Sequence, residues 1–183
     1  MTNTKKETIR IRKLTYSGLF LALGLVLPFL TGQIPQIGSA LSPMHIPVLL
    51  CGFLCGWPWG LAVGCITPLL RSVLFGMPVM FPGAVAMAFE LATYGCIAGW
   101  LYRKLPKKTA MIYLTLIVAM IAGRVVWGIV RLILAGVAGT PFTWTMFIGG
   151  ALTNAIPGII LHIVLIPVLV IALERAGFSL NRE

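Results

Sequence analysis

The sequence contains no aspartate, and only four of its 183 residues are acidic. Charged residues of both signs make up 10% of the chain, against 59% hydrophobic residues and a mean hydropathy of +1.01. A soluble domain of this size and composition would expose too much apolar surface to stay dispersed. The composition therefore predicts an integral membrane protein.

Signatures of nucleotide binding and of metal-dependent hydrolysis are missing as well. The chain has no G-x-x-x-x-G-K-[ST] loop, no dinucleotide-binding glycine fingerprint and no H-E-x-x-H pair. We therefore expect neither an enzyme nor a bound cofactor, and energy for any transport must come from elsewhere. Cys51 and Cys55 lie one helical turn apart and could bind a soft metal, but cysteine in apolar helices usually packs as a small hydrophobe. No metal site is expected.

The formal net charge of +10 could indicate a nucleic-acid partner, but its distribution argues against one. Eleven basic residues lie in three clusters at the ends of apolar segments: Lys5, Lys6, Arg10, Arg12 and Lys13; Arg103, Lys104, Lys107 and Lys108; Arg175 and Arg182. Such clusters are typical of the cytoplasmic side of membrane proteins. The basic residues thus predict topology, and no nucleic-acid partner is expected.

Six apolar segments predict an all-α, polytopic membrane protein with six transmembrane helices. They cover residues 14–30, 43–55, 59–74, 83–102, 111–136 and 143–172, the last of which is long enough to require a tilt or kink. Residues 14–175 are the expected membrane domain, between a basic tail at 1–13 and a short tail at 176–183. Six spans place both termini and every basic cluster in the cytoplasm, and the three outer connections then carry no charge.

The fifth apolar segment carries Arg124 and Arg131 with Trp127 between them. On a helix the two arginines point roughly the same way, about 10 Å apart along the axis. A charge at mid-bilayer costs from about 3 to over 10 kcal/mol, so this stripe must face protein, water or ligand. It predicts a cavity in which an arginine binds an anionic small molecule. Arg131 could instead reach lipid phosphates.

Other polar residues in the apolar segments leave alternatives open. Glu90 could be the counter-ion of Arg124 or Arg71, or it could contact a ligand. Arg71 could line the cavity or reach the lipid headgroups. Asn154 could bind a ligand or another helix, and Trp144 could stack on a ligand or lie at the membrane boundary.

Three further features are open to two interpretations each. His45 and His162 are expected to be structural, with a proton relay as the alternative. The spacing Gly18-x-x-x-Ala22 in the first span creates a face where another helix can approach closely, either within the fold or from a partner.

Three stretches resemble the substrate-binding S components of energy-coupling factor (ECF) transporters, nearest the branch of predicted pantothenate transporters. They are SPMHIPVLLCGFLCGW from Ser42, TPLLRSVLFGMP from Thr67 and MAFELATYG from Met87. The resemblance covers nearly the whole chain.

The resemblance implies a six-helix, vitamin-binding protein of a prokaryotic cell membrane. Its partners would be a transmembrane T component and two cytoplasmic ATPase subunits, which use the ATP, and it would deliver its substrate by toppling in the membrane. Gly18 and Ala22 match the family's docking motif for the T component, although the family usually has alanines there. The family's pocket lies in the outer half, capped by the first outer loop. The matching positions here are Gln33 in that loop and Arg124, Trp127, Arg131 and Asn154.

The first hypothesis is therefore a vitamin-capture subunit for a small anionic vitamin such as pantothenate. Vitamin B6 compounds are the alternative ligand, since aromatic residues and Glu90 would suit a pyridine ring. A self-sufficient proton-coupled transporter that uses Glu90 and a histidine is the alternative of another class. A structural membrane subunit with a lipid-filled cavity is the third hypothesis.

Overall fold

The computed structural model describes residues 3–31, 41–106, 108–141, 143–151 and 155–181. These residues are helical throughout, with short connections and no strand among them. The elements in chain order are α1 (Asn3–Val26), the 3-10 helix η1 (Leu27–Thr31), α3 (His45–Cys55), α4 (Trp57–Phe75), the π-helical turn η2 (Met80–Ala84), α5 (Val85–Lys104), α6 (Thr109–Ala138), α7 (Trp144–Ala151) and α8 (Ile156–Arg175). The predicted all-α class is confirmed.

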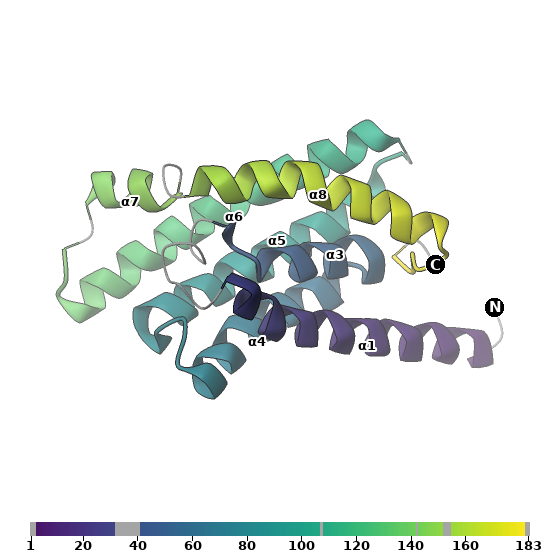
Figure 1. The fold of residues 1–183 in the computed structure, drawn as a ribbon, viewed down its shortest axis with the longest axis horizontal. Helices are drawn as coiled ribbons and strands as arrows, with labels where there is room; N and C mark the ends of the chain where they lie inside the picture. Colours follow the sequence, from purple (N-terminus) through teal and green to yellow (C-terminus); the bar gives the residue numbers. More distant parts are fainter. Residues whose placement is uncertain (1–2, 32–40, 107, 142, 152–154, 182–183) are drawn as a thin grey trace.

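The helices form an elongated bundle in which successive long helices alternate in direction (Figure 1). Both chain termini lie at one end of the bundle, on the right of Figure 1, and this end is called the terminal end below. The short helix α7 lies at the opposite end, called the α7 end. The connection between α5 and α6, which carries the second basic cluster, also lies at the terminal end.

Five helical segments of the described chain are long and apolar enough to cross a membrane. They are Lys6–Leu30, Trp57–Phe75, Met80–Lys104, Thr109–Ala138 and Ile156–Arg175. The second predicted span is helical only as α3, whose 11 residues extend about 16 Å, roughly half of a bilayer core. The sixth predicted span, expected to tilt or kink, is described as two helices, α7 and α8.

The short helix α3 occupies the centre of the bundle, and all of its residues are buried. It contacts α1, α4, α5 and α8, which together shield it from lipid. A helix that is apolar on every side can be stable in this way only when protein surrounds it. Gly56, with φ 102°, ends α3, and Pro58 lies in the first turn of α4, so the chain reverses tightly between the two helices.

Close packing of α4 against α5 depends on glycines of both helices. A Cβ atom added to Gly95 would collide with the backbone of Gly60, and one added to Gly64 would collide with the backbone at Leu91. The Gly60 and Gly64 repeat in the sequence thus serves helix packing within the fold. This packing fixes α5, and with it Glu90, in the interior.

The residues after α8 pack against the terminal end of the bundle. The Leu180 backbone N–H donates to the carbonyl oxygen of Leu54 at 2.8 Å, and the Asn181 side chain donates to that of Gly99 at 3.0 Å. Leu180 and Asn181 are both buried. The Tyr102 hydroxyl also donates to the carboxylate of Glu174. The described part of the predicted C-terminal tail, residues 176–181, is therefore an ordered part of the fold.

At the other end of the chain, α1 begins at Asn3, so the described part of the predicted basic tail is helical and continuous with the first span. Gly18 and Ala22 are exposed on α1, and no atom lies within 4 Å of the position of a Cβ added to Gly18. The neighbouring small residues face inward: Ser17 is buried near Cys51, and Gly24 packs against Thr67. Within this chain, Gly18 does not serve helix packing.

Candidate substrate-binding site

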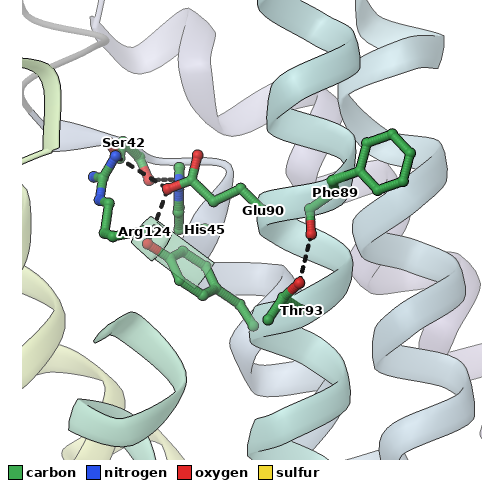
Figure 2. Close-up of polar contacts among 7 residues, drawn as sticks. Ser42, His45, Phe89, Glu90, Thr93 and Arg124 are labelled. Carbon is green, nitrogen blue, oxygen red and sulfur yellow. Dashed lines mark hydrogen bonds and ion pairs between the residues drawn. The ribbon is translucent and has the colours of Figure 1, made fainter. Parts of the chain in front are cut away.

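The buried carboxylate of Glu90 is the centre of a polar cluster between α3, α5 and α6 (Figure 2). One oxygen, Oε1, lies 3.0 Å from Nη1 of Arg124, 2.9 Å from the Tyr94 hydroxyl and 3.5 Å from Nε2 of His45. The side chain of Glu90 is 2% exposed, and that of Arg124 is 19% exposed. Of the two predicted counter-ions, the structure thus selects Arg124. A buried pair of this kind is costly to break, because either partner alone would be an uncompensated charge.

Two histidines extend this cluster toward α8. The Nδ1 atom of His45 lies 3.1 Å from the carbonyl oxygen of Ser42, and its ring stacks on that of His162 at 5.7 Å between centroids. Both histidines are buried. The cluster therefore ties the start of α3 to three long helices, and the structural role expected for both histidines stays a prediction.

A cavity of about 520 Å³ opens at the α7 end, between α6, α7 and η2. Its lining consists of Pro82, Trp127, Arg131, Ala135, Thr140, Pro141, Met146, Gly149 and Gly150. Among the residues that the structure describes, the lining contains one cation, Arg131, and no acidic residue. Its size is within the range of small-molecule sites, and its apolar walls with few polar groups are typical of them.

Trp127 forms one wall of this cavity, and two further rings stack behind it. The ring of Trp127 stacks on that of Phe147 at 6.3 Å between centroids, and Phe147 stacks on Trp144 at 5.2 Å. The guanidinium carbon of Arg131 lies 5.8 Å from the centroid of Trp127, within cation–π range. Trp127 and Arg131 therefore form one surface, as the helical spacing predicted.

Small residues allow α7 to approach this wall. A Cβ atom added to Gly150 would lie 2.7 Å from the ring of Trp127, and one added to Gly128 would collide with Phe147. On the opposite side of α6 the exposed side chains are apolar: Ile121, Val125, Ile129, Leu132 and Ile133. The arginine stripe thus faces protein and cavity, while the apolar side of α6 faces outward.

Arg71 is held elsewhere, away from the cavity lining. Its guanidinium lies between the rings of Phe29 and Phe75, at 5.0 and 5.3 Å from the two centroids, and donates to the carbonyl oxygen of Leu25. The whole residue is buried. In these surroundings Arg71 links η1 to the end of α4, and the structure does not bring it together with Trp127 and Arg131.

The remaining predicted site residues have different positions. Trp144 is 73% exposed and reaches the wall only through Phe147. Asn154 and Gln33 lie outside the described residues. Sequence reasoning missed Tyr94, although it stands one helical turn after Glu90, where it can donate to the carboxylate. It also missed the contributions of η2 and α7, because no spacing rule connects them to α6.

These features define a multi-pass, all-helical membrane protein with a buried charged cluster and a separate cavity at one end. The model of the ECF transporter substrate-specific component family matches residues 12–170, most of the chain, and the chain belongs to this family. It is therefore a membrane-embedded substrate-binding subunit of an ECF transporter, a transport component that works with a T component and ATPases. No curated protein and no solved structure matches the chain significantly.

Proposed function

We propose that this subunit captures a small anionic vitamin, pantothenate, in the cavity at the α7 end. The observation that carries the proposal is the set of described lining residues, which combines the guanidinium of Arg131 with no acidic side chain. A guanidinium can bind a carboxylate through two parallel hydrogen bonds. The apolar wall at Trp127 would cover the uncharged part of the ligand.

The same geometry separates the roles of the two stripe arginines. Arg124 already neutralises Glu90, and neither residue belongs to the cavity lining. We therefore assign binding of the ligand carboxylate to Arg131. The polar cluster around Glu90 instead holds α6 against α3 and α5. Vitamin B6 compounds fit less well, because the carboxylate of Glu90 is taken up by Arg124, Tyr94 and His45.

We further propose six crossings, with α3 as the buried second one, and both termini in the cytoplasm. The alternation of helix direction supports this count, and the basic clusters of α1, the α5–α6 connection and the end of α8 lie at the terminal end. Under the positive-inside rule that end is cytoplasmic. The cavity at the α7 end would then open to the outside, where the vitamin is captured.

For delivery, we propose that the T component docks on the exposed small face of Gly18 and Ala22. Gly18→Leu or Ala22→Leu should abolish cellular uptake while leaving pantothenate affinity nearly unchanged, because neither residue lies near the cavity lining. Gly24→Leu is the matched control, since Gly24 packs on Thr67 and its enlargement should disturb folding instead. Loss of affinity in the Gly18 variant would contradict the docking assignment.

The ligand itself is tested on the purified subunit. Titration calorimetry should show tight binding of pantothenate and much weaker binding of pyridoxine. The subunit alone in liposomes should not accumulate pantothenate under a proton gradient. Concentrative uptake by the isolated chain would favour the proton-coupled transporter instead, and tighter binding of pyridoxine would overturn the choice of vitamin.

A further inference from the structure

The donors and acceptors around His45 do not match unless the cluster holds one additional proton. The carbonyl oxygen of Ser42 can only accept, so the Nδ1 atom of His45 at 3.1 Å must carry a hydrogen. If the imidazole is neutral, the other nitrogen, Nε2, then presents a lone pair. Oε1 of Glu90 lies 3.5 Å from this nitrogen, and an ionised carboxylate presents only lone pairs in return.

Two acceptors facing each other in the interior repel, and the burial of both groups makes the contact expensive. The side chains of His45 and Glu90 are 3% and 2% exposed, so water screens the repulsion little. His45 Nε2 has no hydrogen-bond partner in the described part of the chain that would satisfy the lone pair in another way. A proton between the two atoms removes the conflict, whichever atom carries it.

We propose that His45 and Glu90 share one buried proton, which makes the cluster a proton-binding site inside the bundle. The proton either converts His45 to an imidazolium that faces the carboxylate, or converts Glu90 to a carboxylic acid that donates to Nε2 of His45. In both forms the proton satisfies the facing pair, and no other group has to change.

Three long helices contribute the groups around the proton. α5 contributes Glu90 and Tyr94, α6 contributes Arg124, and α8 contributes His162, whose ring stacks on His45. Arg124 and Glu90 cancel as charges, so the shared proton leaves the cluster with one unit of positive charge. A second proton on His162 would be repelled by the first, since the ring centroids are 5.7 Å apart.

This positive charge has a consequence for anion binding, and that consequence rests on the proposed function. Arg124 lies about 10 Å from Arg131 along α6, so the charged cluster adds to the positive potential at the cavity. Without the shared proton this charge would be absent, and the cavity would attract an anion less strongly. The proton itself can be observed without any ligand.

The test uses the full chain in lipid nanodiscs with ¹⁵N-labelled histidine. The sequence has only two histidines, so His162→Gln assigns both imidazole spectra. At pH 7 we expect either a protonated Nε2 on His45 or, in the infrared spectrum, a carboxylic acid band that disappears in Glu90→Gln. A bare Nε2 on His45 together with an ionised Glu90 at pH 7 would overturn the proposal, and the wild-type chain alone is enough to show it.

A matched pair of variants sharpens the assignment. Glu90→Gln replaces the carboxylate with an amide that can itself donate to Nε2, so His45 should become neutral with its hydrogen on Nδ1. Glu174→Gln is the control, because Glu174 also accepts from a tyrosine hydroxyl but belongs to the terminal end. The control should leave both histidine spectra unchanged. An imidazolium on His45 that persists in Glu90→Gln would contradict a proton shared with Glu90.

Discussion

Two arginines on the same face of α6 have opposite surroundings. Arg124 points at a buried carboxylate 3.0 Å away, within a cluster that also includes a tyrosine and a histidine. Arg131, two turns further, lies over the ring of Trp127 at the edge of a cavity whose described lining residues include no acid. Identical side chains at equivalent helix positions thus have different partners, because the neighbouring helices differ.

The difference teaches that a charge inside a membrane protein is not by itself a ligand site. A buried cation with a fixed carboxylate partner is already satisfied, and its removal is felt by the fold. A cation beside a cavity that lacks acidic groups can attract an anion from outside. The free energy of unfolding should therefore depend on Arg124, and the affinity for the ligand should depend on Arg131.

The largest effect is expected for Arg124→Ala. The substitution leaves Glu90 buried without its counter-ion, which should lower the free energy of unfolding by about 3 to 5 kcal/mol. Thermal unfolding of the purified protein in detergent measures the loss. The double variant Arg124→Gln with Glu90→Gln removes both charges and should recover most of the stability. If Arg124→Ala were as stable as the wild type, the stabilising role assigned to Arg124 would be wrong.

Arg131→Ala should weaken pantothenate binding by about 1.5 to 3 kcal/mol, the range for hydrogen bonds to charged groups. Thermal stability should change little, since Arg131 belongs to the cavity edge. Arg131→Lys should recover only part of the affinity, because an ammonium cannot reproduce the planar, two-pronged contact. Titration calorimetry compares the three proteins, and equal affinities would remove Arg131 from the site.

Trp127→Ala should cost about 1 to 2 kcal/mol of affinity through lost apolar and stacking contact. Trp144→Ala is its matched control, because Trp144 is 73% exposed and does not belong to the cavity lining. Its effect should stay below about 0.5 kcal/mol. An effect of Trp144 equal to that of Trp127 would mean that the whole aromatic stack contacts the ligand.

The smallest effect serves as a control for the comparison. Asn181→Ala removes the hydrogen bond to the Gly99 carbonyl oxygen at the terminal end, which should lower stability by about 1 kcal/mol. Because Asn181 packs at the terminal end and the cavity lies at the α7 end, pantothenate affinity should not change. A loss of affinity in this variant would show that any destabilisation weakens binding. The affinity loss in Arg131→Ala could then not be assigned to a lost ligand contact.

The sequence could predict the features that depend on local spacing and composition. Apolar segments and basic clusters predicted the membrane helices, and the interval between Arg124 and Arg131 predicted their common face. Composition could not predict that α3 is only about half as long as the bilayer core is thick, because a helix this short depends on burial among four surrounding helices. The contribution of α7 to the cavity is likewise a tertiary feature.

For the site, the charge inventory predicted the candidate partners of Glu90 but could not choose between them. Arg71 and Arg124 both stand in apolar helices, and only the packing of α5 against α6 places Arg124 beside the carboxylate. Arg71 instead lies between Phe29 and Phe75, which are distant from each other in sequence. The wall of stacked rings depends in the same way on the close approach of α7 to α6.

The most direct test compares pantothenate affinity in two variants by titration calorimetry. One carries Arg124→Gln together with Glu90→Gln, and the other carries Arg131→Gln alone. We expect the double variant to bind within about threefold of the wild type, and Arg131→Gln to lose about 30-fold or more, which corresponds to about 2 kcal/mol. Retained affinity in Arg131→Gln together with lost affinity in a folded double variant would contradict the division of roles along α6.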